Sequence, residues 1–473
     1  MRPRNQTVRD QLASVLRRRA AASTAELAAQ AGVSVPTMHR LLQEMGDELV
    51  TTGKARRTRH ALRRPLRGDL AALPLYRIDA LGRADQIAQL ALVHPQGSCL
   101  DLTGSAWPVP DESRDGWWAG LPYPLYDMRP QGYLGRQLAR AEHQALGVAP
   151  NPEAWGGDDV VQVLSRAGPD VNGNLILGNP AFLQWQARKL APPPALRPLP
   201  ARSLGRAYAG LAELAIAAGV AGASAAGEFP KFPALRELAG SDTPHVLVKF
   251  SGADGSPAVQ RWSDLLVCEH LALQSATQLP GLQSARSRIV QHSGRTFLEL
   301  ERFDRHGLFG RSALLSLATA AAALLGDGST DWNHLAGRLH SVGWLGADDL
   351  PRIEHLVWFG RLIANSDMHT GNLSLRPVAS AGAAAPAPAP SLQLAPVYDM
   401  LPMRYAPLPG GEVPPRNFEP PAPLPAQRAA WLLACDAAHG FWARAAQDAR
   451  ISAGFRALCG ANAQSLQTLV ARV

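Results

Sequence analysis

The sequence predicts an α+β protein in which a small winged helix-turn-helix unit precedes a larger body of two lobes. Charge is the first observation: residues 1–68 hold 14 Lys and Arg against 5 Asp and Glu, whereas the remainder holds 33 against 34. The second is the pattern beyond about residue 205, where a strand, a glycine-rich turn, a strand, a helix and a strand precede mostly helices. A doubly wound sheet differs, because its strands and helices alternate throughout.

Length and composition narrow the class of protein. A chain of 473 residues is too long for one ordinary core, so we expect two or three domains. With 46% apolar and 18% charged residues it is typical of a globular protein. No window approaches 18 consecutive apolar residues, and the charged start MRPRNQTVRDQL lacks the apolar segment of a secretory signal. We therefore expect no membrane partner. The four cysteines form no CxxC pair, which predicts reduced thiols in a cytoplasmic protein and no zinc site.

The N-terminal unit has the sequence signals of a helix-turn-helix. A helix over residues 7–20 is followed by Ser23 and Glu26, an S-x-x-E capping box whose side chains satisfy the first free amides of the next helix. That helix ends at Gly32, which adopts the left-handed backbone of a tight turn without strain. A second helix begins after Ser34, so the order is helix, glycine-centred turn and helix.

Basic residues on this unit indicate a nucleic-acid partner. Residues 49–63 predict two short strands around a Gly-Lys turn, a basic wing suited to phosphates. Concentrated positive charge is typical of a polyanion-binding module, although a charged hairpin on a protein-docking module is the alternative. We predict DNA binding and, by analogy with winged-helix proteins, a homodimer. The candidate DNA contacts, four early in the second helix and four on the wing, are Ser34, Thr37, His39, Arg40, Lys54, Arg56, Arg57 and Arg59.

The N-terminal domain, residues 1–68, is followed by three parts that differ in pattern. Residues 69–200 predict a small mixed subdomain, residues 201–310 a small lobe with the glycine-rich turn, and residues 311–473 a helical large lobe. Within the last part, residues 376–391 are Ala/Pro low complexity, which buries no core and predicts a surface insertion.

The strongest local signal for chemistry is a D-x-x-x-x-N spacing from Asp367 to Asn372. Phosphoryl transfer to a hydroxyl needs a carboxylate that orients the hydroxyl and accepts its proton, and an amide oxygen that holds Mg²⁺. The spacing alone is common by chance, and a polar loop after a helix is the alternative. The context is more specific, because a helix over residues 355–363 precedes the loop and a later short strand delivers a second carboxylate, Asp399.

A lysine interrupts the apolar strand at residues 246–250. Burying Lys249 without a partner costs free energy, so we expect it to meet a carboxylate or a phosphate. Glu269, on a helix predicted over residues 264–274, is the candidate ion-pair partner, as in the lysine–glutamate pair of kinases. The alternative is an edge-strand lysine that points to water.

Two further segments bear on a nucleotide site. Residues 222–231 are small and glycine-containing, so their amides can approach phosphates, but they match neither standard phosphate-loop motif, and taken alone they indicate a flexible loop rather than a nucleotide site. Residues 297–305 (FLELERFDR) predict a strand that runs into a loop, where backbone groups are offered to adenine.

These segments together resemble the HipA family of Ser/Thr kinase toxins from about residue 75 to the C-terminus, in the branch with an N-terminal DNA-binding extension. The resemblance implies a two-lobed protein-kinase-type fold that uses ATP and Mg²⁺. It also implies an antitoxin partner, although the DNA-binding part that such a partner supplies is here fused to the chain. The motifs that carry the resemblance are ASAAGEFPK (223–231), LVKF (247–250), ELERFDRHG (299–307), NSDMHTGN (365–372) and PVYDM (396–400).

The resemblance implies roles for the residues of the reaction centre. Asp367 is the expected catalytic base, and Asn372 and Asp399 are the expected Mg²⁺ ligands. Lys249, paired with Glu269, is expected to bind the ATP phosphates.

It also implies roles around the nucleotide. Glu301 and Phe303 are expected to meet adenine through their backbones, and Gly227 and Lys231 belong to the ATP-binding loop. Ser224 is the expected autophosphorylation site, where a phosphate would add negative charge beside the ATP phosphates and switch the kinase off.

We therefore expect a kinase that phosphorylates a Ser or Thr of a cellular protein, with DNA binding in the same chain for autoregulation. For His369, in the loop of the expected base, we expect a structural hydrogen bond. Two other functions stay open. One is a transcription regulator whose kinase-like part only senses a ligand. The other is a nuclease that uses Asp367 and Asp399 as metal ligands, although a nuclease has no use for Lys249 or an adenine site.

Overall fold

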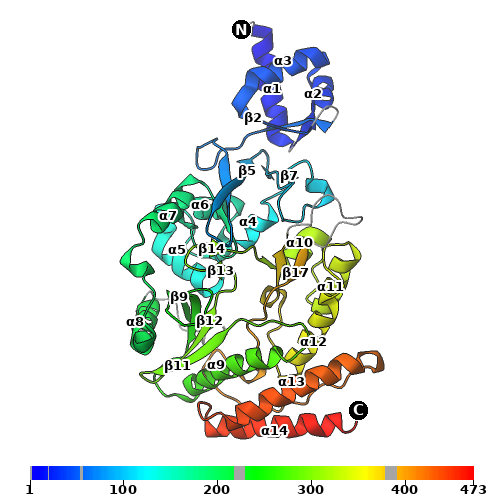
Figure 1. The fold of residues 1–473 in the computed structure, drawn as a ribbon. Coiled ribbons are helices and arrows are strands. Elements are labelled where there is room, and N and C mark those ends of the chain that lie inside the picture. The colour runs from blue at the N-terminus through cyan, green and yellow to red at the C-terminus, as the bar shows by residue number, and fades with distance from the viewer. Residues whose placement is uncertain (1–2, 20, 54–56, 218–228, 379–390) are drawn as a thin grey trace.

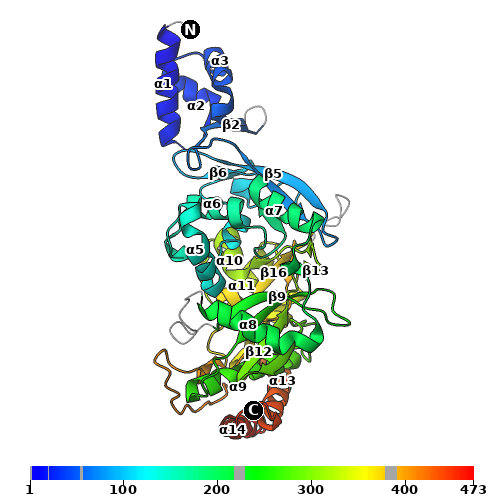
Figure 2. The same cartoon turned by 90° about the vertical axis from the view of Figure 1, so that its left-hand side faces the viewer.

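The computed structural model describes residues 3–19, 21–53, 57–217, 229–378 and 391–473. The molecule is elongated, with a small N-terminal unit at one end and the C-terminal helices at the other (Figures 1 and 2). Helices and strands are mixed along the chain, as the sequence predicts. Within the described residues, no helix combines the length and the apolar character that crossing a membrane requires.

The N-terminal unit has three helices and an antiparallel sheet in the order β1-β3-β2. Apolar side chains of all three helices, among them Leu12, Leu27 and Met38, form a core of its own. The first helix begins and ends earlier than the predicted range 7–20. The elements are α1 (Pro3–Arg18), β1 (Ala22–Ser23), α2 (Thr24–Ala31), α3 (Val35–Met45), β2 (Leu49–Thr52) and β3 (Arg59–Leu62).

Local signals read from the sequence fix how α2 and α3 begin and end. The Ser23 hydroxyl accepts from the Glu26 amide at 3.3 Å, and the Glu26 carboxylate accepts from the Ser23 amide at 2.8 Å, which completes the capping box. Gly32 follows α2 with a φ of +63°, a conformation that strains residues with a Cβ. Ser34 caps α3, and its hydroxyl accepts from the Thr37 amide at 3.3 Å.

The next part of the chain forms a five-stranded antiparallel sheet in the order β7-β6-β5-β4-β8, flanked by four helices. The strands are β4 (Leu73–Ile78), β5 (Ala84–Leu92), β6 (Ser98–Cys99), β7 (Trp117–Trp118) and β8 (Leu175–Leu177). The helices are α4 (Tyr123–Asp127), α5 (Gly132–Leu146), α6 (Gly157–Ala167) and α7 (Asn179–Leu190).

A second antiparallel sheet, in the order β11-β12-β10-β9, lies below the first in Figure 1. Its strands are β9 (Lys231–Leu235), β10 (His245–Phe250), β11 (Ser287–His292) and β12 (Arg295–Glu301), and the helices packed on it are α8 (Leu204–Ala217) and α9 (Pro257–Ala276). Val246, Val248 and Phe250 of β10 join the core beneath α8. Because side chains alternate along a strand, Lys249 faces the α9 side.

Helix α9 is longer than the predicted range 264–274. Ser256 caps it, since its hydroxyl accepts from the Val259 amide at 3.3 Å, and Pro257 occupies the first turn, where a missing amide hydrogen costs nothing. Most of its side chains are buried, including Glu269. In the part added before residue 264, the Ser263 hydroxyl lies 2.6 Å from the Thr296 hydroxyl of β12.

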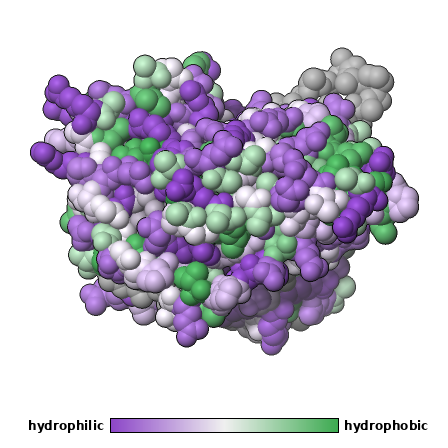
Figure 3. Space-filling model, turned by 90° about the horizontal axis from the view of Figure 1, so that it is seen from below, coloured by the Kyte–Doolittle hydropathy of each residue, from purple (hydrophilic) through white to green (hydrophobic). Residues whose placement is uncertain are grey.

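The C-terminal part is mostly helical, and α13 and α14 form the end of the molecule that Figure 3 views. Hydrophilic and hydrophobic side chains are interspersed on that face. One apolar core runs from the five-stranded sheet through α9 to α13. The helices are α10 (Leu317–Leu325), α11 (Trp332–Ser341), α12 (Asp349–Leu362), α13 (Arg428–Gln447) and α14 (Ala453–Val470). Short strands complete this part: β13 (Arg305–His306), β14 (Gly310–Arg311), β15 (Leu315–Ser316), β16 (Ser374–Pro377) and β17 (Leu392–Leu394).

Candidate active site

A buried lysine joins two carboxylates from distant parts of the chain. Lys249 of β10 is 4% exposed, and its Nζ donates to both carboxylate oxygens of Glu269 at 2.8 Å. The same Nζ donates to Asp399 Oδ1 at 2.5 Å. Burial opposes the charge on the amine, but Asp399 and Glu269 outweigh it and raise the pKa of Lys249. The lysine therefore lies among carboxylates rather than in water.

The two carboxylates differ electrostatically. Burial raises the pKa of Glu269 to about 7, since the opposing effect of Lys249 is partly offset by the negative charge of Asp399. The Asp399 side chain is 31% exposed; the burial of the rest of it favours a higher pKa, but Lys249 and Lys231 hold its pKa below the usual value. Asp399 is thus the carboxylate that stays ionised and is suited to bind a cation.

The backbone at Asp399 has an unusual conformation. Its φ is +56°, in the left-handed region that residues with a Cβ seldom adopt. The preceding Val397 is held by two backbone hydrogen bonds, from its amide to the Gln283 carbonyl at 2.7 Å and from the Ala285 amide to its carbonyl at 2.8 Å. Conformations of this kind persist where the surroundings enforce them, and they concentrate at functional sites.

The loop that carries Asp367 follows α12 through a second left-handed residue, Ala364, with a φ of +59°. Asn365 Oδ1 accepts from the Asp367 amide at 3.0 Å, and Asn372 Nδ2 donates to the Asp367 carbonyl at 2.9 Å. Because the Asn372 amide nitrogen makes that bond, its oxygen is the atom suited to a metal. Burial and the nearby charge of Asp399 raise the pKa of Asp367, which His369 partly offsets.

His369 closes the turn of this loop. Its Nδ1 accepts from the Gly371 amide at 3.1 Å, ahead of a short 3₁₀ turn over Thr370–Asn372. That bond is of the structural kind expected from the sequence.

Tyr398 connects the two loops and was not singled out from the sequence. Its hydroxyl donates to the Gly371 carbonyl at 2.8 Å and lies 2.7 Å from the Ser374 hydroxyl. Its ring contacts Phe303, with 5.9 Å between the centroids. The only sequence signal for Tyr398 was its place beside Asp399.

The segment expected to meet adenine follows β12. The Glu301 amide donates to the Arg286 carbonyl at 2.8 Å, and the Phe303 carbonyl accepts from Arg376 Nη2 at 2.9 Å. The Glu301 carboxylate pairs with Arg236 at 2.5 Å. Because the Glu301 amide and the Phe303 carbonyl already have partners, the backbone groups left for an adenine contact at these two residues are the Glu301 carbonyl and the Phe303 amide.

Several predicted residues lie outside the described part of the chain: Ser224 and Gly227 of the glycine-containing segment, Lys54 and Arg56 of the wing, and most of the Ala/Pro-rich stretch. Lys231 is described, and as the first residue of β9 it lies opposite Lys249 in the register of β9 and β10. The two lysines therefore share one face of the sheet.

The candidate DNA contacts that are described lie on the N-terminal unit. Ser34, His39 and Arg40 are exposed on or before α3, and Thr37 is half-buried beside Ser34, with 2.9 Å between their hydroxyls. Arg57, in the connection between β2 and β3, and Arg59, the first residue of β3, are also exposed.

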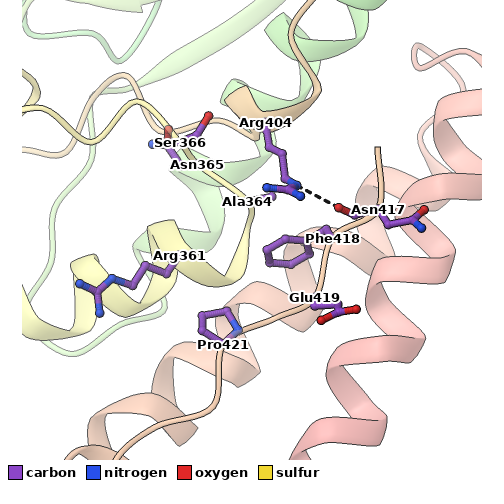
Figure 4. Close-up of a pocket in the computed structure, with 9 residues that line it drawn as sticks. All are labelled: Arg361, Ala364, Asn365, Ser366, Arg404, Asn417, Phe418, Glu419 and Pro421. Atoms are coloured by element: carbon purple, nitrogen blue, oxygen red, sulfur yellow. Dashed lines mark hydrogen bonds between the residues drawn. The ribbon is translucent and has the colours of Figure 1, made fainter. Parts of the chain in front are cut away.

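A cavity of about 570 Å³ lies beside the Asp367 loop (Figure 4). Asn365 and Ser366 line one side of it, and Arg404, five positions beyond Asp399, lines another. Arg404 Nε donates to the Asn417 carbonyl at 2.9 Å, the bond drawn in Figure 4. Phe418 also lines the cavity, which thus borders both segments that carry the candidate carboxylates.

Among the described residues, no group of three or more His, Cys, Asp or Glu side chains is arranged to hold a metal. Mg²⁺ in phosphoryl-transfer sites usually takes only one or two protein carboxylates, together with phosphate oxygens and water. The carboxylate of Asp399 and the amide oxygen of Asn372 fit that donor chemistry.

Comparison with known proteins covers most of the chain. The family described as "YjjJ-like toxin, middle domain" matches residues 69–186, and "HipA-like C-terminal domain" matches residues 223–450. Toxin YjjJ of Escherichia coli (strain K12) is 36% identical over 435 residues, which is 92% of this chain and 92% of that protein.

Two solved structures are similar at lower levels. One is HipA of Shewanella oneidensis MR-1, from a complex of HipA, HipB and operator DNA, at 15% identity and a TM-score of 0.48, covering 85% of this chain and 97% of that one. The other is the Helicobacter pylori proinflammatory kinase CtkA, at 15% identity and a TM-score of 0.26, covering 37% and 53%.

Proposed function

Because the chain belongs to the HipA family of toxins, in its YjjJ type, we propose that it transfers the γ-phosphate of ATP to a Ser or Thr hydroxyl of a cellular protein. The observation that carries the proposal is the convergence of Lys249, Glu269 and Asp399 beside the loop of Asp367. A cation-binding carboxylate, a phosphate-binding amine and a separate base are the parts that phosphoryl transfer requires.

The proposal gives each residue of the reaction centre a separate role. Lys249, oriented by Glu269, binds phosphate oxygens of ATP, and this interaction replaces its contact with Asp399. Asp399 and Asn372 would hold Mg²⁺, which when bound supplies positive charge between the phosphates. Asp367 orients the acceptor hydroxyl and takes its proton as the new oxygen–phosphorus bond forms and ADP leaves.

The raised pKa of Asp367 agrees with the role of a base. A carboxylate that is partly withdrawn from water and lies near another negative charge holds a proton more readily than an exposed one. The cavity lined by Asn365, Ser366 and Arg404 borders the Asp367 loop, and its proposed role is to receive a part of the substrate protein that flanks the acceptor.

Ser224 is the proposed autophosphorylation site, and Gly227, Lys231, Glu301 and Phe303 complete the proposed ATP site. All of these roles come from the family motifs. Phosphate on Ser224 would compete with ATP by charge repulsion and turn the enzyme off.

The N-terminal unit is proposed to be a winged helix-turn-helix that binds DNA through α3 and the strand pair β2–β3. Its exposed cations, among them Arg40, Arg57 and Arg59, support this, since phosphates attract such a surface. DNA binding in the same chain would let the toxin repress its own synthesis. An antitoxin partner, a homodimer and a cytoplasmic location complete the proposal.

Purified wild type and Asp367→Asn should be compared for ATP turnover and for incorporation of labelled γ-phosphate into the chain itself. We expect the variant to lose both by at least about 100-fold. Asp436→Asn, at an exposed site on α13, is the matched control and should equal wild type. Equal signals from wild type and Asp367→Asn would remove the catalytic proposal and favour a ligand-sensing regulator.

The nuclease alternative is tested with the same three preparations. Plasmid DNA is incubated with Mg²⁺ and without ATP, and strand breaks are measured. Cleavage that Asp367→Asn abolishes would favour a nuclease over a kinase.

A further inference from the structure

The side chain of Asn365 contacts both segments that carry the candidate carboxylates. It lies two positions before Asp367 and is 8% exposed. Its Oδ1 accepts from the Asp367 amide at 3.0 Å, and its Nδ2 donates to Met400 Sδ at 3.3 Å. Met400 directly follows Asp399 in the chain and is buried. One side chain therefore joins the loop of the proposed base to the segment of the proposed metal ligand.

The backbone around Asn365 makes further connections. The Arg404 amide donates to the Ala364 carbonyl at 3.1 Å, so the segment after Asp399 also bonds the residue that precedes Asn365. The Asn365 amide donates to the Gly360 carbonyl at 2.9 Å, which ties the start of the loop to α12. The backbone therefore fixes Asn365 relative to both α12 and the segment after Asp399.

Gly360 of α12 provides the space in which the two segments meet. A Cβ atom at this position would lie 2.5 Å from Met368 Sδ and 3.3 Å from Met400 Sδ. Non-bonded atoms pack at roughly 3.5–4.0 Å, so a side chain here would crowd both sulfur atoms. Met368 directly follows the proposed base, as Met400 follows the proposed metal ligand. The residues next to the two carboxylates therefore pack against the same point of α12.

An amide side chain has the donors and acceptor that this place requires. The Asp367 amide can only donate, so the oxygen of Asn365 faces it and the nitrogen faces the sulfur of Met400, which is a weak acceptor. An apolar side chain at position 365 would leave the Asp367 amide without its acceptor. Asn365 is therefore matched to both of its partners.

We propose that Asn365 is a positioning residue, which through Met400 holds the proposed base at a fixed distance from the proposed metal ligand. The inference rests on the proposed phosphoryl transfer, where a displacement of about 1 Å can cost roughly 100-fold in rate. Asn365 acts through Asp367 and Asp399 and not on the reacting atoms. Tyr398, on the other side of Asp399, bonds the far end of the same loop, so both neighbours of Asp399 are held.

Asn365→Leu removes both hydrogen bonds and tests the effect on turnover. We expect kcat to fall about 10–100-fold while KM for ATP changes less than about twofold, because the residues that bind ATP are unchanged. Met400→Leu keeps the volume and removes only the sulfur acceptor, so kcat should fall by a smaller factor. In the double variant kcat should equal that of Asn365→Leu, since the two side chains act as one unit. Losses that multiply in the double variant would overturn the connection through Met400.

Hydrogen exchange at the Asp367 amide tests the same connection without turnover. A wild type that transfers no phosphate would remove the proposed function, whereas exchange would still decide whether Met400 restrains the Asp367 loop. Met400→Leu should speed exchange at Asp367 by about three- to tenfold, because Asn365 loses one of the two contacts that hold its amide. Exchange at the wild-type rate in Met400→Leu would contradict the proposal, and this readout applies even if Asn365→Leu does not fold.

Two control variants lie in the N-terminal unit. Met45→Leu makes the same change at another buried methionine and should leave kcat and exchange at Asp367 as in wild type. Thr24→Val removes a buried hydroxyl that lies 3.0 Å from His60 Nε2, and it should lower stability without changing either readout. If Asn365→Leu likewise lost stability alone, its role would be structural and the proposal would be wrong.

Discussion

Lys249 Nζ lies 2.5 Å from Asp399 Oδ1, although 150 positions separate the two residues in the chain. In the proposed reaction the amine binds phosphate and the carboxylate binds the metal, so this contact occupies both groups before the nucleotide arrives. Binding of ATP with Mg²⁺ would break the Lys249–Asp399 ion pair, but it would give Lys249 a phosphate partner and Asp399 a metal partner. These two new interactions would offset the free energy needed to separate the pair.

Replacing Lys249 with Met should remove turnover and also destabilise the fold. The variant leaves the buried Glu269 and the partly exposed Asp399 without their cation. Breaking a buried pair costs about 3–5 kcal/mol, and because Asp399 reaches solvent we expect the lower end of that range for the loss of unfolding free energy. We expect ATP affinity to fall at least about tenfold, since a charge-assisted contact to phosphate is lost. Urea unfolding and fluorescence titration with an ATP analogue measure the two effects.

A double variant separates the two effects of Lys249→Met. Adding Asp399→Asn should recover part of the stability, because one uncompensated carboxylate is removed, but none of the turnover. Arg472→Met, at an exposed cation beyond the end of α14, should leave both quantities unchanged. Full activity in the double variant would show that Lys249 does not bind phosphate.

Glu269→Gln should change how stability depends on pH. Burial raises the pKa of Glu269 to about 7 from a usual value of 4.5, and Asp399 adds to the shift against the opposing effect of Lys249. A carboxyl with a raised folded-state pKa stabilises the fold below its unfolded pKa, and this contribution is lost as pH rises through the folded value. The stability of wild type relative to the variant should therefore fall by up to about 3 kcal/mol between pH 4.5 and 7.

Urea unfolding at a series of pH values provides that measurement. Glu412→Gln, at an exposed site, is the control, and its curve should run parallel to that of wild type. A Glu269→Gln curve that is likewise parallel would mean that Glu269 titrates at the same pH in the folded and unfolded chain.

Tyr398→Phe tests the connection between the two loops. The variant keeps the ring contact with Phe303 but removes the hydroxyl that bonds the Gly371 carbonyl and the Ser374 hydroxyl. We expect a loss of about 1–2 kcal/mol of unfolding free energy, because buried partners lose their hydrogen bond. Since Gly371 adjoins Asn372, the Mg²⁺ concentration for half-maximal turnover should also rise.

Tyr126→Phe, at an exposed tyrosine on α4, is the control for that experiment. A purely structural role for Tyr398 would lower stability and leave the Mg²⁺ dependence of turnover unchanged. The two readouts therefore separate positioning of the metal ligand from general stabilisation.

The sequence was informative where local chemistry decides the structure. The capping box of Ser23 and Glu26 and the left-handed turn at Gly32 depend on residues within one helical turn, and both are present. The approach of Glu269 to Lys249 was also predictable, because a buried strand lysine requires a partner and the following helix supplied one carboxylate at the right face. The resemblance to the HipA family is likewise confirmed.

Contacts between distant segments were not predictable from the sequence. The bond from Lys249 to Asp399 depends on how β10 packs against a loop far along the chain, and on a left-handed φ at Asp399 that its residue type does not favour. The contact of Arg305 with Asp170 likewise spans 135 positions. No periodicity or motif records such a pairing, because tertiary packing alone brings the two side chains together.

Exposed cations of the N-terminal unit should set its affinity for DNA. Arg40, Arg57 and Arg59 are exposed on α3 and the strand pair, and each phosphate contact contributes about 0.9 to the slope of log affinity against log salt. We expect Arg57→Ala and Arg59→Ala each to reduce that slope by about one, measured by fluorescence anisotropy with a labelled duplex from the upstream region of the gene.

Arg40→Ala should in addition lower the preference for that duplex over an unrelated one, because an early residue of the second helix is placed for base contact. Arg338→Ala removes the same charge from α11 and should leave slope and preference unchanged, so an equal loss in that control would mean that DNA responds only to the total charge of the chain.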